Sequence, residues 1–192
     1  MLILRKIAVT GFLASGKSSV CQLLSQHGAY VVDADKIAHH ILEGNEAREQ
    51  VINLLGQTVV IDSHISRKKI ASEVFKDPQK LDALEKIIHP LVFQKIHQEY
   101  EFAKNFPYLC FVAEVPLLYE AGWEKFFDTI ITVVSDNSLC KKRFKERGGD
   151  EKEYDLRMKR RTSPKQRDQT IYNNGSIDAL QTAVERFIRS SI

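Results

Sequence analysis

The stretch Gly11-Phe12-Leu13-Ala14-Ser15-Gly16-Lys17-Ser18 directly follows the apolar run of residues 7–9. It matches the pattern G-x-x-x-x-G-K-[ST], in which a buried strand leads through a glycine-bearing turn into a helix. The glycines let backbone N–H groups turn inward around phosphate oxygens, and the helix beginning at Ser18-Ser19 faces the anion with its positive end. The stretch therefore predicts a nucleotide phosphate loop. A strand-to-helix turn with a merely solvated lysine is the disfavoured alternative.

Two side chains of this motif have specific expected roles. Lys17 adds a full positive charge that can reach the terminal phosphates of the nucleotide. The Ser18 hydroxyl is placed to hold the Mg²⁺ ion that bridges these phosphates. We therefore expect residues 11–19 to bind nucleotide and Ser18 to bind the metal.

The composition is that of one globular domain. The chain has 192 residues, of which 43% are hydrophobic, enough to form a core. A net charge of +3 is small for this size, so no nucleic-acid partner is expected. No apolar stretch approaches the roughly 20 residues needed to cross a bilayer, and no signal peptide is recognisable. These patterns predict no membrane partner and a cytoplasmic location, with Cys21, Cys110 and Cys140 as buried reduced thiols.

Apolar runs alternate with helical patterns along the chain. The runs cover residues 7–9, 30–32, 109–115 and 129–134. Such alternation predicts an α/β protein of the P-loop NTPase and kinase type, with a doubly wound parallel sheet flanked by helices. The segment between the second and third runs is far too long for one crossover helix, so we expect an insert there.

The insert shows helical spacing in four segments, residues 36–42, 46–55, 67–75 and 91–103. Glycines and prolines separate these segments, and we expect Pro90 to end one helix and open the next. A helical insert beside a phosphate loop usually covers the second substrate, and the alternative is that it only completes the core. The predicted single kinase domain has a core of residues 1–35, 107–138 and 168–192, an insert of residues 36–106 and a lid of residues 139–167.

Carboxylates at strand ends are the candidates for proton transfer. Asp33 and Asp35 follow the run of residues 30–32, so they emerge at the carboxyl end of a strand, where ligands collect in parallel sheets. Asp33 is the candidate general base, and Asp35 is an alternative base or the N-cap of the helix that follows. Glu114, on another apolar run, is a candidate for contact with Mg²⁺ through water.

The predicted lid is rich in arginine. Arg143 and Arg147 are four residues apart and so share one helix face, and Arg157, Arg160 and Arg161 follow after a Gly-Gly-Asp break. Arginines on a closing lid can stabilise charge on the phosphoryl group that is transferred. The alternative is a solvated helix face whose charge is balanced by neighbouring acidic residues.

Taken together, these motifs resemble the dephospho-coenzyme A kinase family over nearly the whole chain. The similar segments, in family order, are Thr10 with the phosphate loop, Val32-Asp33-Ala34-Asp35, Arg67 ahead of residues 74–75, Leu84-Glu85-Lys86-Ile87-Ile88-His89-Pro90, Val115-Pro116-Leu117-Leu118-Tyr119-Glu120, and Ile171-Tyr172-Asn173-Asn174-Gly175. The phosphate loop is shared with many kinases, whereas the other elements in combination are specific to this family.

The resemblance implies ATP-dependent phosphorylation of the ribose 3'-hydroxyl of dephospho-coenzyme A, with Mg²⁺. It assigns Asp33 as the base and assigns Lys17, Arg143 and Arg147 to the phosphates. It puts Thr10, Arg67 and His89 near the acceptor, and Asn173 and Gly175 near the adenine of ATP.

The chain departs from the family pattern at two places. Phe12, Leu13 and Ala14 stand where the family usually has more glycine, and Arg161 stands about where the lid usually has glutamine. Two other functions remain open: another small-molecule kinase, such as a nucleoside or nucleotide kinase, and a non-enzymatic nucleotide switch. The switch is disfavoured because the chain lacks the Asn-Lys-x-Asp element that reads guanine.

Overall fold

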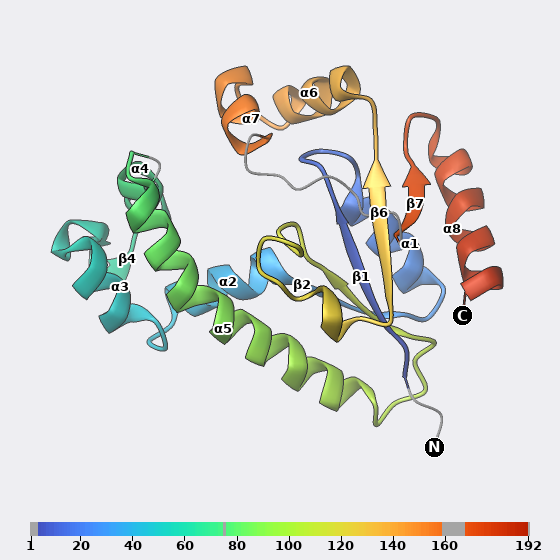
Figure 1. Cartoon of the computed structure of the whole chain (residues 1–192), viewed down its shortest axis with the longest axis horizontal. Coiled ribbons are helices and arrows are strands. Elements are labelled where there is room, and N and C mark those ends of the chain that lie inside the picture. The colour runs from blue at the N-terminus through green and yellow to red at the C-terminus, as the bar shows by residue number, and fades with distance from the viewer. Residues whose placement is uncertain (1–3, 75, 159–167, 192) are drawn as a thin grey trace. The chain divides into compact units, whose positions relative to one another are not determined.

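The computed structural model describes residues 4–74, 76–158 and 168–191, and these form two compact units (Figure 1). The first unit contains the described residues up to Asp33 and those from Tyr100 onward, and the second is Ala34–Glu99. Two arginines of the predicted lid, Arg160 and Arg161, lie outside the described residues.

The first unit is built on a parallel sheet, as the sequence predicts. Its strands lie in the order β2-β5-β1-β6-β7, and each neighbouring pair runs parallel. Their bounds are β1 Lys6–Gly11, β2 Tyr30–Asp33, β5 Phe111–Glu114, β6 Thr129–Val134 and β7 Gln169–Tyr172. Because β1 lies in the middle, the phosphate loop at its carboxyl end has the ends of β5 and β6 on either side.

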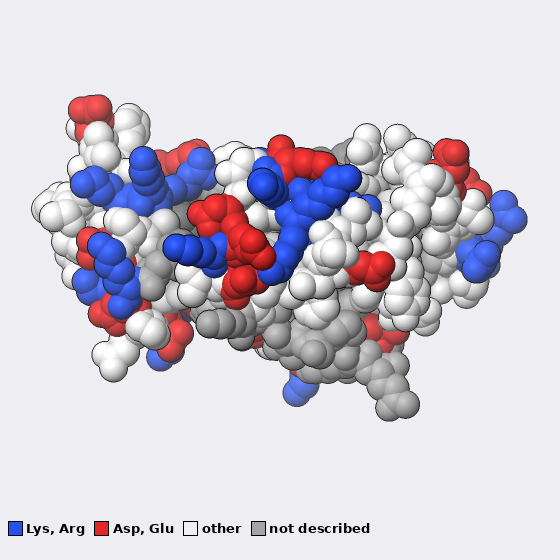
Figure 2. Space-filling model, turned by 90° about the horizontal axis from the view of Figure 1, so that it is seen from above, with Lys and Arg blue, Asp and Glu red and all other residues white. Residues whose placement is uncertain are grey.

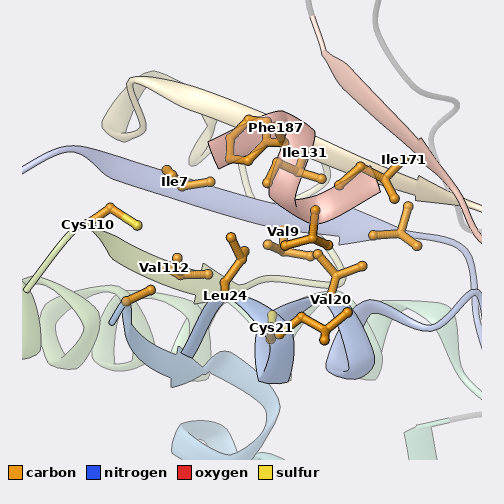
Figure 3. Close-up of a cluster of buried hydrophobic side chains, with 14 of the residues drawn as sticks. Ile7, Val9, Val20, Cys21, Leu24, Cys110, Val112, Ile131, Ile171 and Phe187 are labelled. Carbon is orange, nitrogen blue, oxygen red and sulfur yellow. The ribbon is translucent and has the colours of Figure 1, made fainter. Parts of the chain in front are cut away.

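One face of this sheet packs against α1 (Lys17–Gln26) and α8 (Ile177–Ser191). Figure 3 shows the resulting buried cluster, which includes Val20 and Leu24 of α1, Phe187 of α8, and Ile7, Val9 and Ile131 of the strands. The Ser176 hydroxyl accepts a hydrogen bond from the Ala179 N–H at 3.3 Å and so caps α8.

The opposite face of the sheet is covered by aromatic side chains. Alternation along β5 directs Phe111 away from its neighbours Cys110 and Val112, which belong to the cluster of the first face. The Phe111 ring lies 5.4 Å from the Tyr100 ring and 6.1 Å from the Tyr30 ring, centroid to centroid. Both faces are therefore buried, as a parallel sheet requires. After β6 the chain continues into α6 (Asn137–Glu146) and α7 (Glu151–Met158), and the loop before β6 contains the 3-10 helix η2 (Glu124–Phe126).

The second unit is mainly helical. Its elements are α2 Ala34–Glu43, α3 Arg48–Leu55, η1 Gln57–Val59, β3 Val60–Ile61, β4 His64–Ile65, α4 Arg67–Val74 and the greater part of α5 Pro78–Ala103. The antiparallel hairpin of β3 and β4 was not predicted. Its strands are too short to show alternation, and its turn uses Asp62 and Ser63, both with positive φ, instead of glycine.

The prediction that Pro90 divides two helices was wrong, because α5 continues through it. An interior proline removes one backbone hydrogen bond and costs about 3 kcal/mol. Leu84, Ile88, Val92 and Ile96 lie on both sides of Pro90 at intervals of four residues and are all buried. A single continuous helix buries all four of these side chains, and this packing outweighs the free-energy cost of the interior proline. Neither α5 nor any other helix within the described ranges is long and apolar enough to cross a membrane.

The three cysteines are buried free thiols, as predicted. Cys110 is completely inaccessible in the sheet cluster. Burial raises the pKa of its thiol from the usual 9.0 to about 11. Between these two values the unfolded chain loses the thiol proton while the folded chain keeps it, so this contribution to stability is complete below pH 9 and is lost toward pH 11.

We therefore expect the free energy of unfolding to fall more steeply above pH 9 in the wild type than in Cys110→Ala. The difference between the two proteins should shrink by about 2 kcal/mol from pH 8 to pH 11, since one pKa unit corresponds to about 1.4 kcal/mol. Urea titrations at several pH values measure this difference. A difference that stays constant across the range would contradict the burial argument.

Candidate active site

The phosphate loop joins the end of β1 to the start of α1. Gly16 is the N-cap of α1 and has a φ of 98°. The Lys17 ammonium donates hydrogen bonds to the carbonyl oxygens of Gly11 and Phe12, at 3.2 and 3.1 Å. The positive charge of Lys17 is therefore held at the loop, where the helix N-terminus also favours an anion.

Ser15 and Gly16 have distinct roles in the shape of this loop. Ser15 is fully buried, and its hydroxyl has no hydrogen-bond partner among the described residues, so a donor is available inside the loop. A Cβ on Gly16 would overlap the side-chain amide nitrogen of Asn173, so Asn173 can lie this close to the loop only with glycine there. Ala14, one of the residues that departs from the family pattern, adopts a left-handed φ of 58°.

Two carboxylates end neighbouring strands beside this loop. Asp33 at the end of β2 pairs in register with Glu114 at the end of β5. Glu114 is 8% exposed, and its Oε1 accepts a hydrogen bond from the Ser18 hydroxyl at 3.2 Å. This hydrogen bond connects Ser18, the predicted metal ligand, with Glu114, which the sequence suggests only as a candidate for contact with Mg²⁺ through water. A hydroxyl and carboxylates are ligands that suit Mg²⁺.

Asp35 occupies a different position from the one predicted. Helix α2 begins at Ala34, so Asp35 lies inside its first turn and is not the N-cap. Its side chain is exposed, whereas that of Asp33 is half-buried at the sheet edge. A carboxylate in the first turn still interacts favourably with the helix dipole.

The pKa of the Cys21 thiol in α1 is affected by burial and by both carboxylates, Glu114 and Asp33. Burial, then the negative charges of Glu114 and Asp33, raise the pKa of the Cys21 thiol well above its usual range, and Lys17 lowers it to a smaller extent. The thiol therefore stays protonated at neutral pH and is a poor nucleophile.

Arg143 lies where the carboxyl ends of β6 and β7 meet the loop. Its Nη1 donates to the Ser135 hydroxyl and its Nη2 to the Asn173 carbonyl oxygen, both at 3.1 Å. Asn173 is buried with its side chain against the loop, and Gly175 is exposed. Sequence reasoning missed Ser135, although it directly follows a predicted strand, which is the same signal that identified Asp33.

Two other basic residues of α6 and α7 are paired with acids. Lys141 of α6 contacts Glu151 at 2.8 Å and Asp155 at 3.1 Å, and Arg157 contacts Glu153 at 2.6 Å. Figure 2 shows blue and red side chains next to each other on the face formed by α6 and α7. Arg147 follows α6 as its C-cap and is exposed.

The remaining predicted residues fall in both units. Thr10 is buried in the first unit, and its hydroxyl donates to the Pro116 carbonyl oxygen at 3.4 Å. Arg67 and His89 belong to the second unit. Arg67 begins α4 and is exposed, with its Nε 4.0 Å from Glu43, and His89 is half-buried in α5. Their predicted role at the acceptor stays a prediction.

Comparisons with known proteins agree on one family. The family model described as "CoaE: Dephospho-CoA kinase" matches residues 5–178. A dephospho-CoA kinase of Protochlamydia amoebophila is 44% identical over 194 residues, which cover 96% of this chain and 95% of that protein. A crystal structure from Thermus thermophilus has a TM-score of 0.84 at 27% identity and full coverage of both chains. The dephospho-CoA kinase from Campylobacter jejuni has a TM-score of 0.70 at 24% identity, with 96% of both chains covered.

We expect Gly16→Ala to raise the dissociation constant for ATP roughly tenfold or more, because the added methyl group pushes the Asn173 amide off the loop and costs at least a hydrogen bond. Gly28→Ala is the matched control. Gly28 has a similar φ of 91°, but a Cβ there meets only Leu109 at an ordinary 3.9 Å.

Isothermal titration with ATP measures the affinity of each variant, and the melting temperature measures its stability, so that a loss of ATP affinity can be distinguished from a loss of stability. Both variants should lose stability from the positive φ, and only Gly16→Ala should lose ATP affinity. Equal ATP affinities in the two variants would show that the contact with Asn173 is unimportant.

Proposed function

This chain belongs to the dephospho-CoA kinase family, and from that membership we propose how its residues phosphorylate dephospho-coenzyme A. It is a kinase whose family performs the last step of coenzyme A biosynthesis. The observation that carries the proposal is the pair of carboxylates, Asp33 and Glu114, that ends neighbouring strands beside the phosphate loop.

In the proposed reaction, Asp33 accepts the proton of the ribose 3'-hydroxyl. The 3'-oxygen forms a bond to the γ-phosphorus of ATP, and the bond from that phosphorus to the bridging oxygen of ADP breaks. The position of Asp33 at the carboxyl end of β2 supports this role, because ligands of parallel sheets bind at that edge. The exposed position of Asp35 in α2 favours Asp33 over Asp35 as the base.

Positive charge around the migrating phosphoryl group comes from Lys17, Arg143 and Arg147 in this proposal. Two N–H groups of Arg143 already bind Ser135 and Asn173, and a guanidinium has five such donors, so others remain for phosphate oxygens. Mg²⁺ would be held by Ser18, with Glu114 nearby, and would neutralise charge on the phosphates.

We also propose that Thr10, Arg67 and His89 bind the acceptor and that the loop residues 11–19 with Asn173 and Gly175 bind ATP. ATP, dephospho-coenzyme A and both products are water-soluble metabolites, so the cytoplasm is the proposed compartment.

An ADP-release assay with ATP, Mg²⁺ and dephospho-coenzyme A, run beside a panel of nucleosides and nucleoside monophosphates, tests this function. Mass spectrometry should find one added phosphate on dephospho-coenzyme A alone. Phosphorylation of a panel member instead would assign another acceptor. Nucleotide binding without turnover on any acceptor would favour a non-enzymatic switch.

We expect Asp33→Asn to bind ATP normally while kcat falls by roughly a hundredfold to ten-thousandfold, the usual loss when a general base is removed. The substitution keeps the shape of the side chain and leaves the phosphate loop untouched. Asp35→Asn removes a carboxylate two residues away and should keep kcat within about threefold of wild type. Comparable losses in both variants, or none in Asp33→Asn, would refute the assignment of Asp33.

A further inference from the structure

We propose that Ser135 and Asn173 hold one peptide group of the phosphate loop in the orientation that binds phosphate, and that Arg143 links this arrangement to α6. We call these three residues and the Ser15 carbonyl the loop clamp. The inference rests on the proposed function only in that the phosphate loop binds ATP. It gives Ser135 a role that no motif indicates.

The clamp consists of short hydrogen bonds between buried groups. The Ser15 carbonyl oxygen accepts from the Asn173 side-chain amide at 2.8 Å and is 3.0 Å from the Ser135 hydroxyl. Ser15, Ser135 and Asn173 are 0%, 6% and 7% exposed. Three strand ends, those of β1, β6 and β7, therefore meet at one carbonyl group of the loop.

Fixing this carbonyl also fixes the next N–H. The described part of the chain contains no cis peptide bond, and in a planar trans peptide the C=O and N–H point in opposite directions. When the Ser15 C=O points at Ser135 and Asn173, the Gly16 N–H must point away from them, and this is the side on which we propose that phosphate binds. A donor oriented in advance needs no reorganisation when the phosphate arrives.

Arg143 contacts both the Ser135 hydroxyl and one of the two carbonyl oxygens that this hydroxyl can reach. A hydroxyl has one proton, and two carbonyl oxygens lie within reach, that of Asn173 at 2.7 Å and that of Ser15 at 3.0 Å. Arg143 Nη2 already donates to the Asn173 oxygen, and Nη1 donates to Ser135 Oγ. Because Arg143 already donates to the Asn173 oxygen, that oxygen keeps a donor when the Ser135 proton goes to Ser15. Arg143 is thus a positioning residue for the loop, in addition to its proposed contact with phosphate.

The direct test is Ser135→Ala, with the dissociation constant for ATP measured by titration in the absence of acceptor. We expect it to rise three- to tenfold, the effect of one lost hydrogen bond, while the KM for dephospho-coenzyme A stays unchanged. Ser135→Thr restores a hydroxyl and should return ATP affinity to near the wild-type value.

Thr132→Val is the matched control for stability. Thr132 lies on β6, three residues before Ser135, is buried, and its hydroxyl donates to Asp168 at 2.8 Å and not to the loop. Both variants should unfold at lower denaturant concentration, but only Ser135→Ala should lose ATP affinity. If Ser135→Ala loses stability and binds ATP like the wild type, Ser135 is merely structural and the clamp is refuted.

The link through Arg143 is tested by a double-mutant cycle on ATP affinity. If Arg143 acts through Ser135, the combined loss in Arg143→Ala/Ser135→Ala is smaller than the product of the single losses. If the losses of ATP affinity in the two single variants multiply in the double variant, Arg143 acts independently of Ser135 and is not part of the clamp. Because ATP binding is measured without acceptor, failure to phosphorylate dephospho-coenzyme A would overturn the proposed reaction and leave this test intact.

Discussion

The parallel pairing of β1 with both β5 and β6 is the constraint on which the active site depends. In a parallel sheet all carboxyl ends lie at the same edge, so residues far apart in sequence arrive together without any dedicated scaffold. This edge carries the phosphate loop after β1, Asp33 of β2, Glu114 of β5, Ser135 after β6 and Asn173 after β7. The two hydrophobic faces keep these ends in register, and therefore fold stability and site geometry share one origin.

The sequence predicts well those features that short segments determine. The phosphate loop is recognisable because glycine, lysine and serine at fixed spacing have one structural explanation. Asp33 is recognisable because it directly follows an apolar run, and strand ends are where ligands bind. The parallel sheet follows from the alternation of runs and helices. For the loop and for Asp33 the deciding residues lie within about ten positions of one another, and for the sheet each run is recognisable by itself, so local propensity and pattern suffice.

Features decided by distant contacts were missed. Pro90 lies inside α5 because buried residues on both sides of it stabilise one continuous helix. A prediction from the neighbouring sequence takes account of the proline but not of this packing. Ser135 acts on Ser15, which is 120 positions earlier in the chain, and a serine after a strand has many ordinary explanations. The register that sets Asp33 opposite Glu114 likewise becomes visible only when the sheet is assembled. The predicted start of the helix after Asp35 was two residues too late, which is enough to exchange a cap for a first-turn position.

The strand order also governs how the protein is made. In the described sheet β2 has β5 as its neighbour and does not touch β1, and residues 34–110 separate β2 from β5 along the chain. A nascent chain that has left the ribosome up to β2 therefore has two apolar strands that cannot pair with each other. The helices of the second unit make mostly local contacts and can form during this interval, whereas the sheet must wait for β5 and β6. Until then the edges of β1 and β2 are unpaired, and unpaired strand edges are the sites at which incomplete chains associate with one another.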